Sequence, residues 1–365
     1  MARIAFFMWP AIGHLNPTLK IARTLQKSGH QLFYLGLSDL ERKISSQGFE
    51  FLAISDEINN MDQLLKRGFF RGFFQLWPRI MAILKKIKPD LLVVDEILRE
   101  IAVQAQKIGF PGVLVSTKLQ EVPISFGGNN EAANSIADLP VLVLCPREFD
   151  SPDGPMKKNR YSVEASIDLE RRELYPFPWE KLDDSKPIIY CSFGSNPDQY
   201  DLCQKIMVEV IEAIERMPEW QLVLASGGCL DSMIYNRVNR NIIVVDWVPQ
   251  LEMLKKASIM ITHGGLGTIK ECIFLGVPMI VLPMKWDQPT NAVRVAYHGL
   301  GLQGDPNLIT SRQINSFIDI LENDESLRSR VASMSKIFKE AEDLGGAVKI
   351  IENVLALSSG PRRRV

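Results

Sequence analysis

The chain has 365 residues, of which 46% are hydrophobic and 23% are charged, and its formal net charge is −1. This length exceeds one ordinary hydrophobic core and predicts two domains of about 150–180 residues. The near-zero charge gives no broad field that would favour nucleic acid or an acidic membrane. Five scattered cysteines without a CxxC pair argue against a disulfide framework or a zinc site and indicate a cytoplasmic protein. No apolar run reaches the roughly 18–20 residues of a membrane-spanning helix.

Apolar runs alternate with helical patterns through the first part of the chain. We expect strands at 2–9, 30–36, 49–54, 91–94, 113–116 and 141–144. Helices are expected between them at 15–27, 39–47, 60–88 and 96–107. The strands are nearly continuous hydrophobic runs, which is typical of parallel strands buried on both faces. The pattern therefore predicts an α/β domain with a doubly wound sheet.

Two titratable side chains follow predicted strands of this domain. His14 comes after the first strand, and Asp95 ends the strand at 91–94. Ligands of open α/β sheets bind at the carboxyl ends of the strands, so we expect both side chains at a binding edge. A neutral imidazole has the pKa range of a general base. Alternatively, His14 is satisfied by water or a backbone carbonyl, and Asp95 is the N-cap of the helix at 96–107.

The predicted helix at 60–88 carries an unusual number of large aromatic side chains. Phe69, Phe73 and Trp77 fall at helical spacing, with Phe70 and Phe74 beside them. The simpler interpretation is an amphipathic helix that packs on the sheet. The functional interpretation makes Phe69, Phe73 and Trp77 the lid or wall of a lipophilic pocket, or part of a membrane-surface patch.

The first domain is expected to cover residues 1–168, followed by a charged and proline-rich linker at 169–186. The second domain, 187–342, repeats the α/β pattern with strands at 187–191, 220–225, 242–245, 258–262 and 278–282. Its helices are expected at 201–216, 251–256, 289–297, 311–322 and 325–342. A last helix at 346–357 and a basic tail complete the segment 343–365. No G-x-G-x-x-G follows a predicted strand, which argues against an NAD dehydrogenase, and no D-x-D pair offers a metal site.

The run from Trp247 to Gln288 is the most informative part of the sequence. It contains a strand that ends at His263, a loop of small residues at 264–268, a helix and a second buried strand. Glycines let backbone N–H groups approach a ligand closely, and a helix that begins there points its unpaired N–H groups at an anion. His263 and Thr268 add side-chain donors at the same place. The loop therefore predicts a diphosphate site.

Other side chains of this run suit the remaining parts of a nucleotide sugar. Glu271 lies one helical turn inside, where a carboxylate can accept two vicinal ribose hydroxyls. Trp247 offers a flat surface on which a base can stack. Asp287 and Gln288 provide donors and acceptors for sugar hydroxyls.

This run resembles the donor-binding signature of the family 1 UDP-dependent glycosyltransferases. The matching residues are Trp247, Pro249, Gln250, Leu254, His263, Gly265, Glu271, Gly276, Val277, Pro278, Pro283, Asp287 and Gln288. The run is two residues shorter before His263 than the plant pattern, and 266–268 reads Leu-Gly-Thr where that pattern has Trp-Asn-Ser. The turn 192–195 resembles the Ser-Phe-Gly-Ser/Thr turn of the family, and 13–17 resembles its Gly-His-x-Asn-Pro motif.

The resemblance implies the GT-B fold, with two Rossmann-like domains facing across a cleft, and a helix at 343–365 that packs back on the first domain. It also implies that His14 is the catalytic base and that Asp95 bonds its far nitrogen. The implied donor-binding residues are Gly13, Ser195, Trp247, Val248, Gln250, His263, Gly265, Leu266, Gly267, Thr268, Glu271, Asp287 and Gln288. No metal and no other cofactor is expected. The implied reaction is inverting transfer of a hexose, with glucose favoured by Asp287 and Gln288, from a UDP-sugar to a small lipophilic alcohol or phenol, giving a β-glycoside.

Three other functions stay open at this point. A hydrolysing UDP-sugar 2-epimerase shares the architecture but needs a carboxylate cluster, and only Glu271 and Asp287 are candidates. A binding module without activity would not need both His14 and Asp95. A glycolipid-forming transferase with peripheral membrane contact would use the aromatic helix. Composition and pattern do not predict the oligomeric state.

Overall fold

The computed structural model describes residues 1–55, 57–58, 69–119, 139–150, 158–173, 175–235 and 237–358, with only the backbone described at 69–74, 232 and 235. It divides into two compact units. Unit 1 consists of Met1–Arg147, Ser151–Leu174 and Ala341–Val365, and unit 2 consists of Glu148–Asp150 and Tyr175–Glu340. None of the described helices is both long and apolar enough to cross a membrane.

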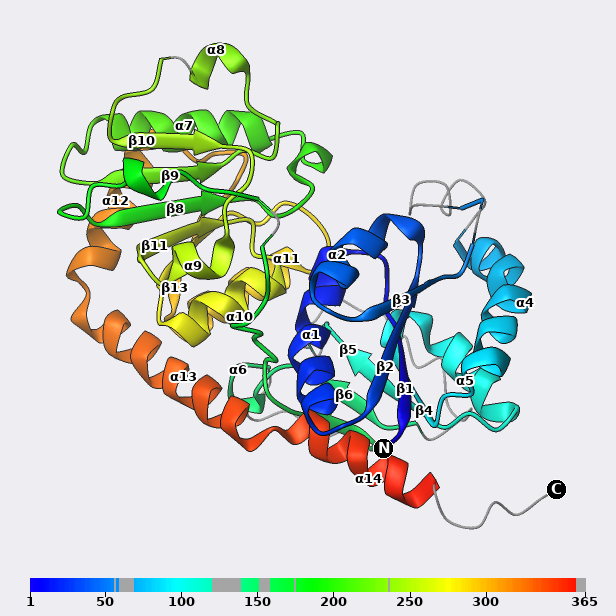
Figure 1. The fold of residues 1–365 in the computed structure, drawn as a ribbon. Coiled ribbons are helices and arrows are strands. Elements are labelled where there is room, and N and C mark those ends of the chain that lie inside the picture. The colour runs from blue at the N-terminus through cyan, green and yellow to red at the C-terminus, as the bar shows by residue number, and fades with distance from the viewer. Residues whose placement is uncertain are drawn as a thin grey trace, which may run out of the picture. The chain divides into compact units, whose positions relative to one another are not determined.

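Unit 1 is built on a seven-stranded parallel sheet in the order β3-β2-β1-β4-β5-β6-β7 (Figure 1). Its strands are β1 (Arg3–Phe7), β2 (Gln31–Gly36), β3 (Glu50–Ala53), β4 (Leu91–Asp95), β5 (Gly112–Ser116), β6 (Val141–Val143) and β7 (Arg160–Ser162). The helices of unit 1 are α1 (Ile12–Lys27), α2 (Glu41–Ser46), α4 (Phe69–Ile87), α5 (Arg99–Lys107) and α14 (Gly346–Ser358), with single 3₁₀ turns η1 (Ser38–Leu40) and η2 (Glu96–Leu98).

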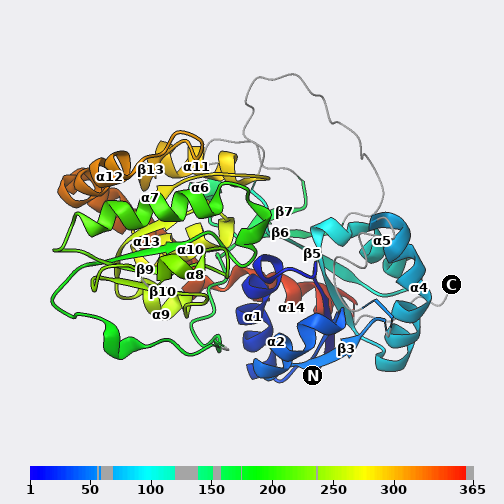
Figure 2. The ribbon, with the colours of Figure 1, turned by 90° about the horizontal axis from the view of Figure 1, so that it is seen from above.

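Alternate residues of each strand enter two separate cores, as the pleat of a strand requires. On β1, Ile4 and Phe6 pack with α1, α2 and α14, whereas Ala5 and Phe7 pack with α4 and α5. Figure 2 shows these two groups of helices on opposite faces of the sheet. In the described part of α4, Leu76, Ile80, Leu84 and Ile87 form the buried stripe. Both faces of the sheet are therefore covered, as expected for parallel strands.

Unit 2 is built on a six-stranded parallel sheet in the order β10-β9-β8-β11-β12-β13. Its strands are β8 (Ile188–Ser192), β9 (Gln221–Ala225), β10 (Ile242–Val245), β11 (Ala257–Thr262), β12 (Met279–Val281) and β13 (Gly301–Gln303). Its helices are α7 (Cys203–Glu215), α8 (Ser232–Tyr235), α9 (Gln250–Leu254), α10 (Leu266–Leu275), α11 (Gln288–Tyr297) and α12 (Ser311–Asn323), with 3₁₀ turns η3 (Trp179–Lys181) and η4 (Pro197–Gln199). Two further helices extend across the division of the chain, namely α6 (Arg147–Asp150) and α13 (Glu325–Leu344).

The last helix, α14, belongs to unit 1. Ala347, Ile351 and Leu355 are buried in the core that α1 shares. The Glu164 carboxylate accepts hydrogen bonds from the backbone N–H of Ala347 at 3.0 and 3.3 Å, at the first turn of α14. A carboxylate there satisfies an unpaired helix N–H and complements the helix dipole.

Most element predictions are confirmed, with differences that have physical reasons. Helix α1 begins at Ile12, three residues before the predicted start, so His14 lies within its first turn. The strands β7 and β13 were not predicted. β7 is an edge strand with partly exposed residues and carries little apolar signal. β13 begins at Gly301, where an added Cβ would lie 2.1 Å from the Met279 carbonyl oxygen, so a close strand approach needs glycine there.

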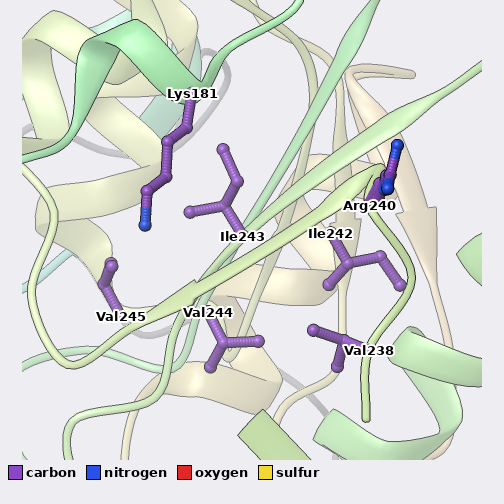
Figure 3. A pocket seen from close by; sticks show the side chains of 7 residues that line it. All are labelled: Lys181, Val238, Arg240, Ile242, Ile243, Val244 and Val245. Carbon is purple, nitrogen blue, oxygen red and sulfur yellow. The ribbon is translucent and has the colours of Figure 1, made fainter. Parts of the chain in front are cut away.

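The edge strand β10 borders a cavity of about 380 Å³ (Figure 3). Its lining combines aliphatic side chains with two cationic ones: Lys181, Val238, Arg240, Ile242, Ile243, Val244 and Val245. None of the predicted donor-binding or catalytic residues belongs to this lining. The cavity is therefore not the site that the sequence predicts.

Candidate active site

His14 and Asp95 meet at the carboxyl edge of the unit 1 sheet. His14 Nδ1 lies 2.7 Å from Asp95 Oδ2, and the Asp95 side chain is only 1% exposed. A carboxylate can only accept here, so His14 Nδ1 carries a proton, and in the neutral imidazole Nε2 is then the nitrogen with the lone pair. No hydrogen bond to Nε2 is found within the described residues, and the His14 side chain is 20% exposed. The contact leaves one imidazole nitrogen able to accept a proton.

Asp95 makes both of the contacts that the sequence predicts for it. Its Oδ1 accepts a hydrogen bond from the Ile97 backbone N–H at 3.0 Å and so caps η2. Its Oδ2 bonds His14 and also accepts from the Trp9 backbone N–H at 3.3 Å. The N–H donors fix the carboxylate, and the carboxylate fixes the imidazole.

A third side chain at this edge was not predicted. The Thr117 hydroxyl lies 3.0 Å from His14 Nδ1, directly after β5. The signal was present in the sequence, because Thr117 follows a predicted strand next to the one that ends at Asp95. Gly13 is exposed one residue before His14, and an added Cβ there would meet no atom within 4 Å.

In unit 2, His263 follows β11 and lies between two glycines. A Cβ added at Gly194 would lie 2.8 Å from His263 Cε1, and one at Gly265 would lie 2.7 Å from Nε2. Gly194 also has a positive φ of 90°. The imidazole therefore occupies a slot that larger residues at these two positions would close.

Burial sets the charge of this imidazole. His263 is 7% exposed, and desolvation lowers its pKa from 6.5 to about 4. The ring is therefore neutral at neutral pH and offers one N–H donor and one acceptor. Thr262 Oγ1 lies 3.4 Å from its Nδ1.

The loop after His263 opens α10 with free amide groups. Gly265 is the N-cap, and neither a side-chain cap nor an acidic residue is present in the first turn. The first α-helical bond is accepted by Gly265 from Ile269, so the N–H groups of Leu266, Gly267 and Thr268 have no intrahelical acceptor. An added Cβ at Gly267 would meet no atom within 4 Å. This geometry is suited to binding an anion.

Gln250 joins two of the predicted donor residues. Its Nε2 donates to Glu271 Oε2 at 2.6 Å and to Thr268 Oγ1 at 3.3 Å. Both acceptors are buried, with Glu271 6% and Thr268 8% exposed. The amide of Gln250, at the start of α9, therefore positions polar groups on α10.

The aromatic part of the predicted site contains one residue that was not predicted. Trp247 is half-buried, and its ring centroid lies 5.2 Å from that of the exposed Tyr175. Val248 is buried behind it at 4% exposure. Ser195 is exposed at the turn after β8.

Gln288 differs from the expectation that its amide is offered to a sugar. It is 2% exposed, and its Oε1 accepts from the backbone N–H groups of Met284 and Lys285 at 2.9 Å each. Its Nε2 donates to the Tyr200 hydroxyl at 2.9 Å. The side chain therefore holds the loop before α11, whereas Asp287 beside it is partly exposed.

Two further contacts support this loop. Asn291 Nδ2 donates to Asp287 Oδ2 at 2.9 Å and to the Gly264 carbonyl at 3.0 Å, which joins α11 to the loop of His263.

Trp286 is 68% exposed and has a positive φ of 58°. A left-handed conformation at a bulky residue stores backbone strain of the kind that collects at functional sites.

The structure describes only some of the aromatic side chains of α4. Trp77 is partly buried against the core of unit 1, which agrees with the packing interpretation. The side chains of Phe69 and Phe73 lie outside the described residues, as does the basic tail. Within the described residues, no group of three or more His, Cys, Asp or Glu side chains could hold a metal ion.

Known proteins that are similar to this chain are glycosyltransferases. A family model described as UDP-glucoronosyl and UDP-glucosyl transferase matches residues 170–362. The chain is 28% identical to the NDP-glycosyltransferase YjiC of Bacillus licheniformis, over 97% of each chain. It is 22% identical to the demethyllactenocin mycarosyltransferase of Streptomyces fradiae, over 98% of this chain and 87% of that one. The solved glycotransferase of kitacinnamycin is similar in fold, with a TM-score of 0.79 and 24% identity over 97% of this chain and 99% of that one.

The family resemblance and the GT-B architecture that the run 247–288 predicts are therefore confirmed. The family model covers more than half of the chain, including the whole donor signature. The fold likeness extends over nearly the full length. The chain belongs to the UDP-glucoronosyl and UDP-glucosyl transferase family and is a glycosyltransferase of the GT-B fold.

Proposed function

We propose that this enzyme transfers a hexose from a UDP-sugar to a hydroxyl group of a small lipophilic acceptor, with inversion at the anomeric carbon. The hexose in this proposal is glucose. The observation that carries the proposal is the 2.7 Å contact between His14 Nδ1 and the buried Asp95 carboxylate. A histidine held in this way has the tautomer that a general base needs. In this proposal unit 1 supplies the base, and unit 2 binds the donor.

The chemical step follows from that tautomer. His14 Nε2 accepts the proton of the acceptor hydroxyl while its oxygen attacks the anomeric carbon of the sugar. The bond from this carbon to the phosphate oxygen of the donor breaks, and UDP leaves with the electron pair. Attack opposite to the leaving group turns an α-linked donor into a β-glycoside. Asp95 stabilises the imidazolium that forms.

The donor side stabilises the charge on the departing UDP. The N–H groups at the start of α10, together with Thr268, Ser195 and the neutral His263 imidazole, provide donors to the diphosphate. A neutral His263 adds no positive charge, so the proposal assigns most of this stabilisation to backbone amides. Glu271, held by Gln250, binds the ribose hydroxyls, and Trp247 stacks on the base.

The sugar and the acceptor are the finer parts of the proposal. The partly exposed Asp287 is the residue that we assign to the hexose hydroxyls. The relative from Streptomyces fradiae is named for transfer of a mycarosyl group to demethyllactenocin, which supports a small organic acceptor. Phe69 and Phe73 are proposed to contact this acceptor.

The test is a panel of UDP-sugars against mixed lipophilic alcohols and phenols. Mass spectrometry should show a product heavier by one hexose with UDP-glucose as the preferred donor, and NMR of the purified glycoside should show a β-linkage. An α-linkage, or a product that forms equally well without the His14 side chain, would contradict the mechanism. Incubation with UDP-N-acetylglucosamine alone separates the 2-epimerase, because only an epimerase releases a new sugar without an acceptor. Adding a chelator should leave the rate unchanged, because amides bind the diphosphate in this proposal.

A further inference from the structure

The outer edge of β10 has no neighbouring strand. Among the described strands, β10 pairs only with β9 and therefore ends the six-stranded sheet of unit 2. The carbonyl groups of Asn241 and Val245 accept hydrogen bonds from the β9 side of the sheet at 2.8 Å each. In a parallel ladder, alternate residues bond the same neighbour. The backbone groups of Ile242 and Val244 therefore face away from β9, towards the free edge.

Within the described part of the chain, this free edge offers one backbone donor between two acceptors. The Ile242 N–H already donates to the Asn239 carbonyl at 3.0 Å, so the carbonyl of Ile242 is the group that it presents. The N–H and carbonyl of Val244 bond none of the described loops and helices. An extended segment that adds to a sheet binds through such main-chain groups. The edge of β10 can therefore pair with one more strand.

The cavity along this edge provides apolar contacts for an added segment. It measures about 380 Å³ and lies alongside β10 (Figure 3). Ile243, Val244 and Val245 are partly exposed in it, and Ile242 and Val238 complete its aliphatic lining. Side chains of a strand alternate between its two faces, so these residues offer apolar surface on both sides of the edge. A segment with aliphatic residues of its own fits this surface.

Two cationic side chains determine which charge the segment should carry. Figure 3 shows Lys181 beside Ile243, with its amine towards Val245, and Arg240 at the other end of the cavity. Within the described residues neither cation has an ion pair, and no acidic side chain belongs to the lining. Two copies of this edge would bring four cations together, and like charges destabilise strand pairing. The charges therefore favour an acidic segment over a second copy of this chain.

We propose that the free edge of β10 binds an extended segment of a partner protein as an added strand, and that this segment has aliphatic residues between acidic ends. At roughly 3.3 Å per residue, β10 spans about 10 Å, so a segment of about six or seven residues reaches both cations. Its amides donate to the Ile242 and Val244 carbonyls, one of its carbonyls accepts from the Val244 N–H, and its acids pair with Lys181 and Arg240. This surface does not depend on the proposed donor site.

The test uses the full chain and the synthetic peptide acetyl-Asp-Asp-Val-Ile-Val-Asp-Asp-amide. Calorimetry should show one bound peptide per chain. Hydrogen exchange at the Val244 amide should become slower, whereas the Ile243 amide, which faces β9, should change less. One further peptide is N-methylated at both valines and another at the isoleucine. Because these amides point to opposite sides of an extended strand, one methylated peptide should lose binding and the other should keep it.

Variants of the chain test the charges and the edge separately. Lys181→Glu and Arg240→Glu should each weaken peptide binding about tenfold. Lys336→Glu, at a side chain 77% exposed on α13, makes the same change of charge away from the cavity and should leave the affinity unchanged. Val244→Pro removes the edge-facing N–H, which a proline at a sheet edge does not need, and should abolish binding.

Several results would overturn the proposal. Failure of the acidic peptide to bind would show that the two cations only protect the edge from other strands. Equal binding of the two methylated peptides would exclude an added strand, whatever the variants do. Binding of decanoate by Lys181 and Arg240 without binding of the peptide would assign the cavity to a lipophilic anion. Dimers of the chain that Val244→Pro dissociates would assign the edge to a second copy.

Discussion

Two proposed functional regions are built in opposite ways: the catalytic edge of unit 1, formed by His14, Asp95 and Thr117, and the donor loop of unit 2, residues 264–268. The first consists of side chains from three distant points of the sequence, His14, Asp95 and Thr117, joined by contacts of 2.7 and 3.0 Å. The second lies mostly in one continuous run and offers backbone amides, with glycines that leave room for an imidazole. Chemistry that moves a proton depends on a few exact side-chain contacts, whereas holding a diphosphate depends on the course of the backbone.

Replacing His14 should have the largest effect. His14→Ala should lower kcat by about 10²–10⁴-fold, because the base is lost, while UDP affinity stays near wild type. Single-turnover kinetics and calorimetry with UDP measure the two quantities separately. His30→Ala is a matched control, since His30 lies in the same unit with a side chain 15% exposed against 20% for His14, and its Nδ1 accepts only from the Ala2 backbone. A large loss of UDP affinity in His14→Ala would show that the two regions do not divide the work in this way.

The buried imidazole of unit 2 should make that unit sensitive to acid. The folded state binds the His263 proton only near its pKa of about 4, whereas the unfolded chain binds it near 6.5. Stability is therefore full above that higher value and is lost as pH falls from about 6.5 to about 4. At about pH 5 the loss in the free energy of unfolding amounts to roughly 2 kcal/mol. Denaturant unfolding at about pH 7 and about pH 5 should show that difference in the wild type and not in His263→Gln. An equal pH response of wild type and His263→Gln would mean that the imidazole of unit 2 is not buried in solution.

Unit 1 provides a contrast of opposite sign. Burial, together with the charge of Glu342, raises the pKa of Glu164, while the Ala347 N–H partly offsets the shift. An acid with a raised folded pKa contributes its stability at low pH and loses it as pH rises through that pKa. Glu164→Gln should therefore remove a contribution that grows on acidification.

A methyl group in the glycine slot should weaken donor binding without affecting the base. In Gly265→Ala the new Cβ would lie 2.7 Å from His263 Nε2, although the φ of −60° and ψ of 131° are allowed for alanine. The ring must move, and UDP affinity should fall about tenfold in calorimetry. Gly112→Ala, where the nearest atoms are 3.7 Å away at ordinary contact distance, is the matched control. Unchanged affinity in Gly265→Ala would remove His263 from the donor site.

The contrast between the two regions also explains what could be predicted from the sequence. The donor loop was recognisable because strand, glycines and helix follow one another between Trp247 and Gln288. The limits of α11 and α12 followed from periodicity and differ from the structure by one residue at most. β13 was missed because three residues beginning with glycine give no strand pattern, and its place is set by the backbone of Met279.

Roles that depend on distant partners were harder to predict. Gln288 carries an amide that could bind sugar hydroxyls, but this amide is hydrogen-bonded to the Tyr200 hydroxyl and to two backbone N–H groups. Tyr200 lies 88 positions earlier in the chain, so no local pattern indicates the contact. Asn291 is bonded to Gly264, 27 positions away, for the same reason. Three-dimensional packing decides which polar side chains support the backbone and which remain for a ligand.

The smallest effect is expected at Thr117, and it tests how the catalytic edge is held. Thr117→Val keeps the shape of the side chain and removes the hydroxyl that lies 3.0 Å from His14 Nδ1. Asp95 still holds the same nitrogen, so kcat should fall only about 2–10-fold, the equivalent of one hydrogen bond of roughly 0.5–1.5 kcal/mol. Thr117→Ser should restore the rate because it restores the hydroxyl. A loss as large as that of His14→Ala, or a change in KM for the donor that exceeds the change in kcat, would mean that Thr117 contacts substrate rather than the imidazole, and the catalytic edge would then be larger than the His14–Asp95 pair.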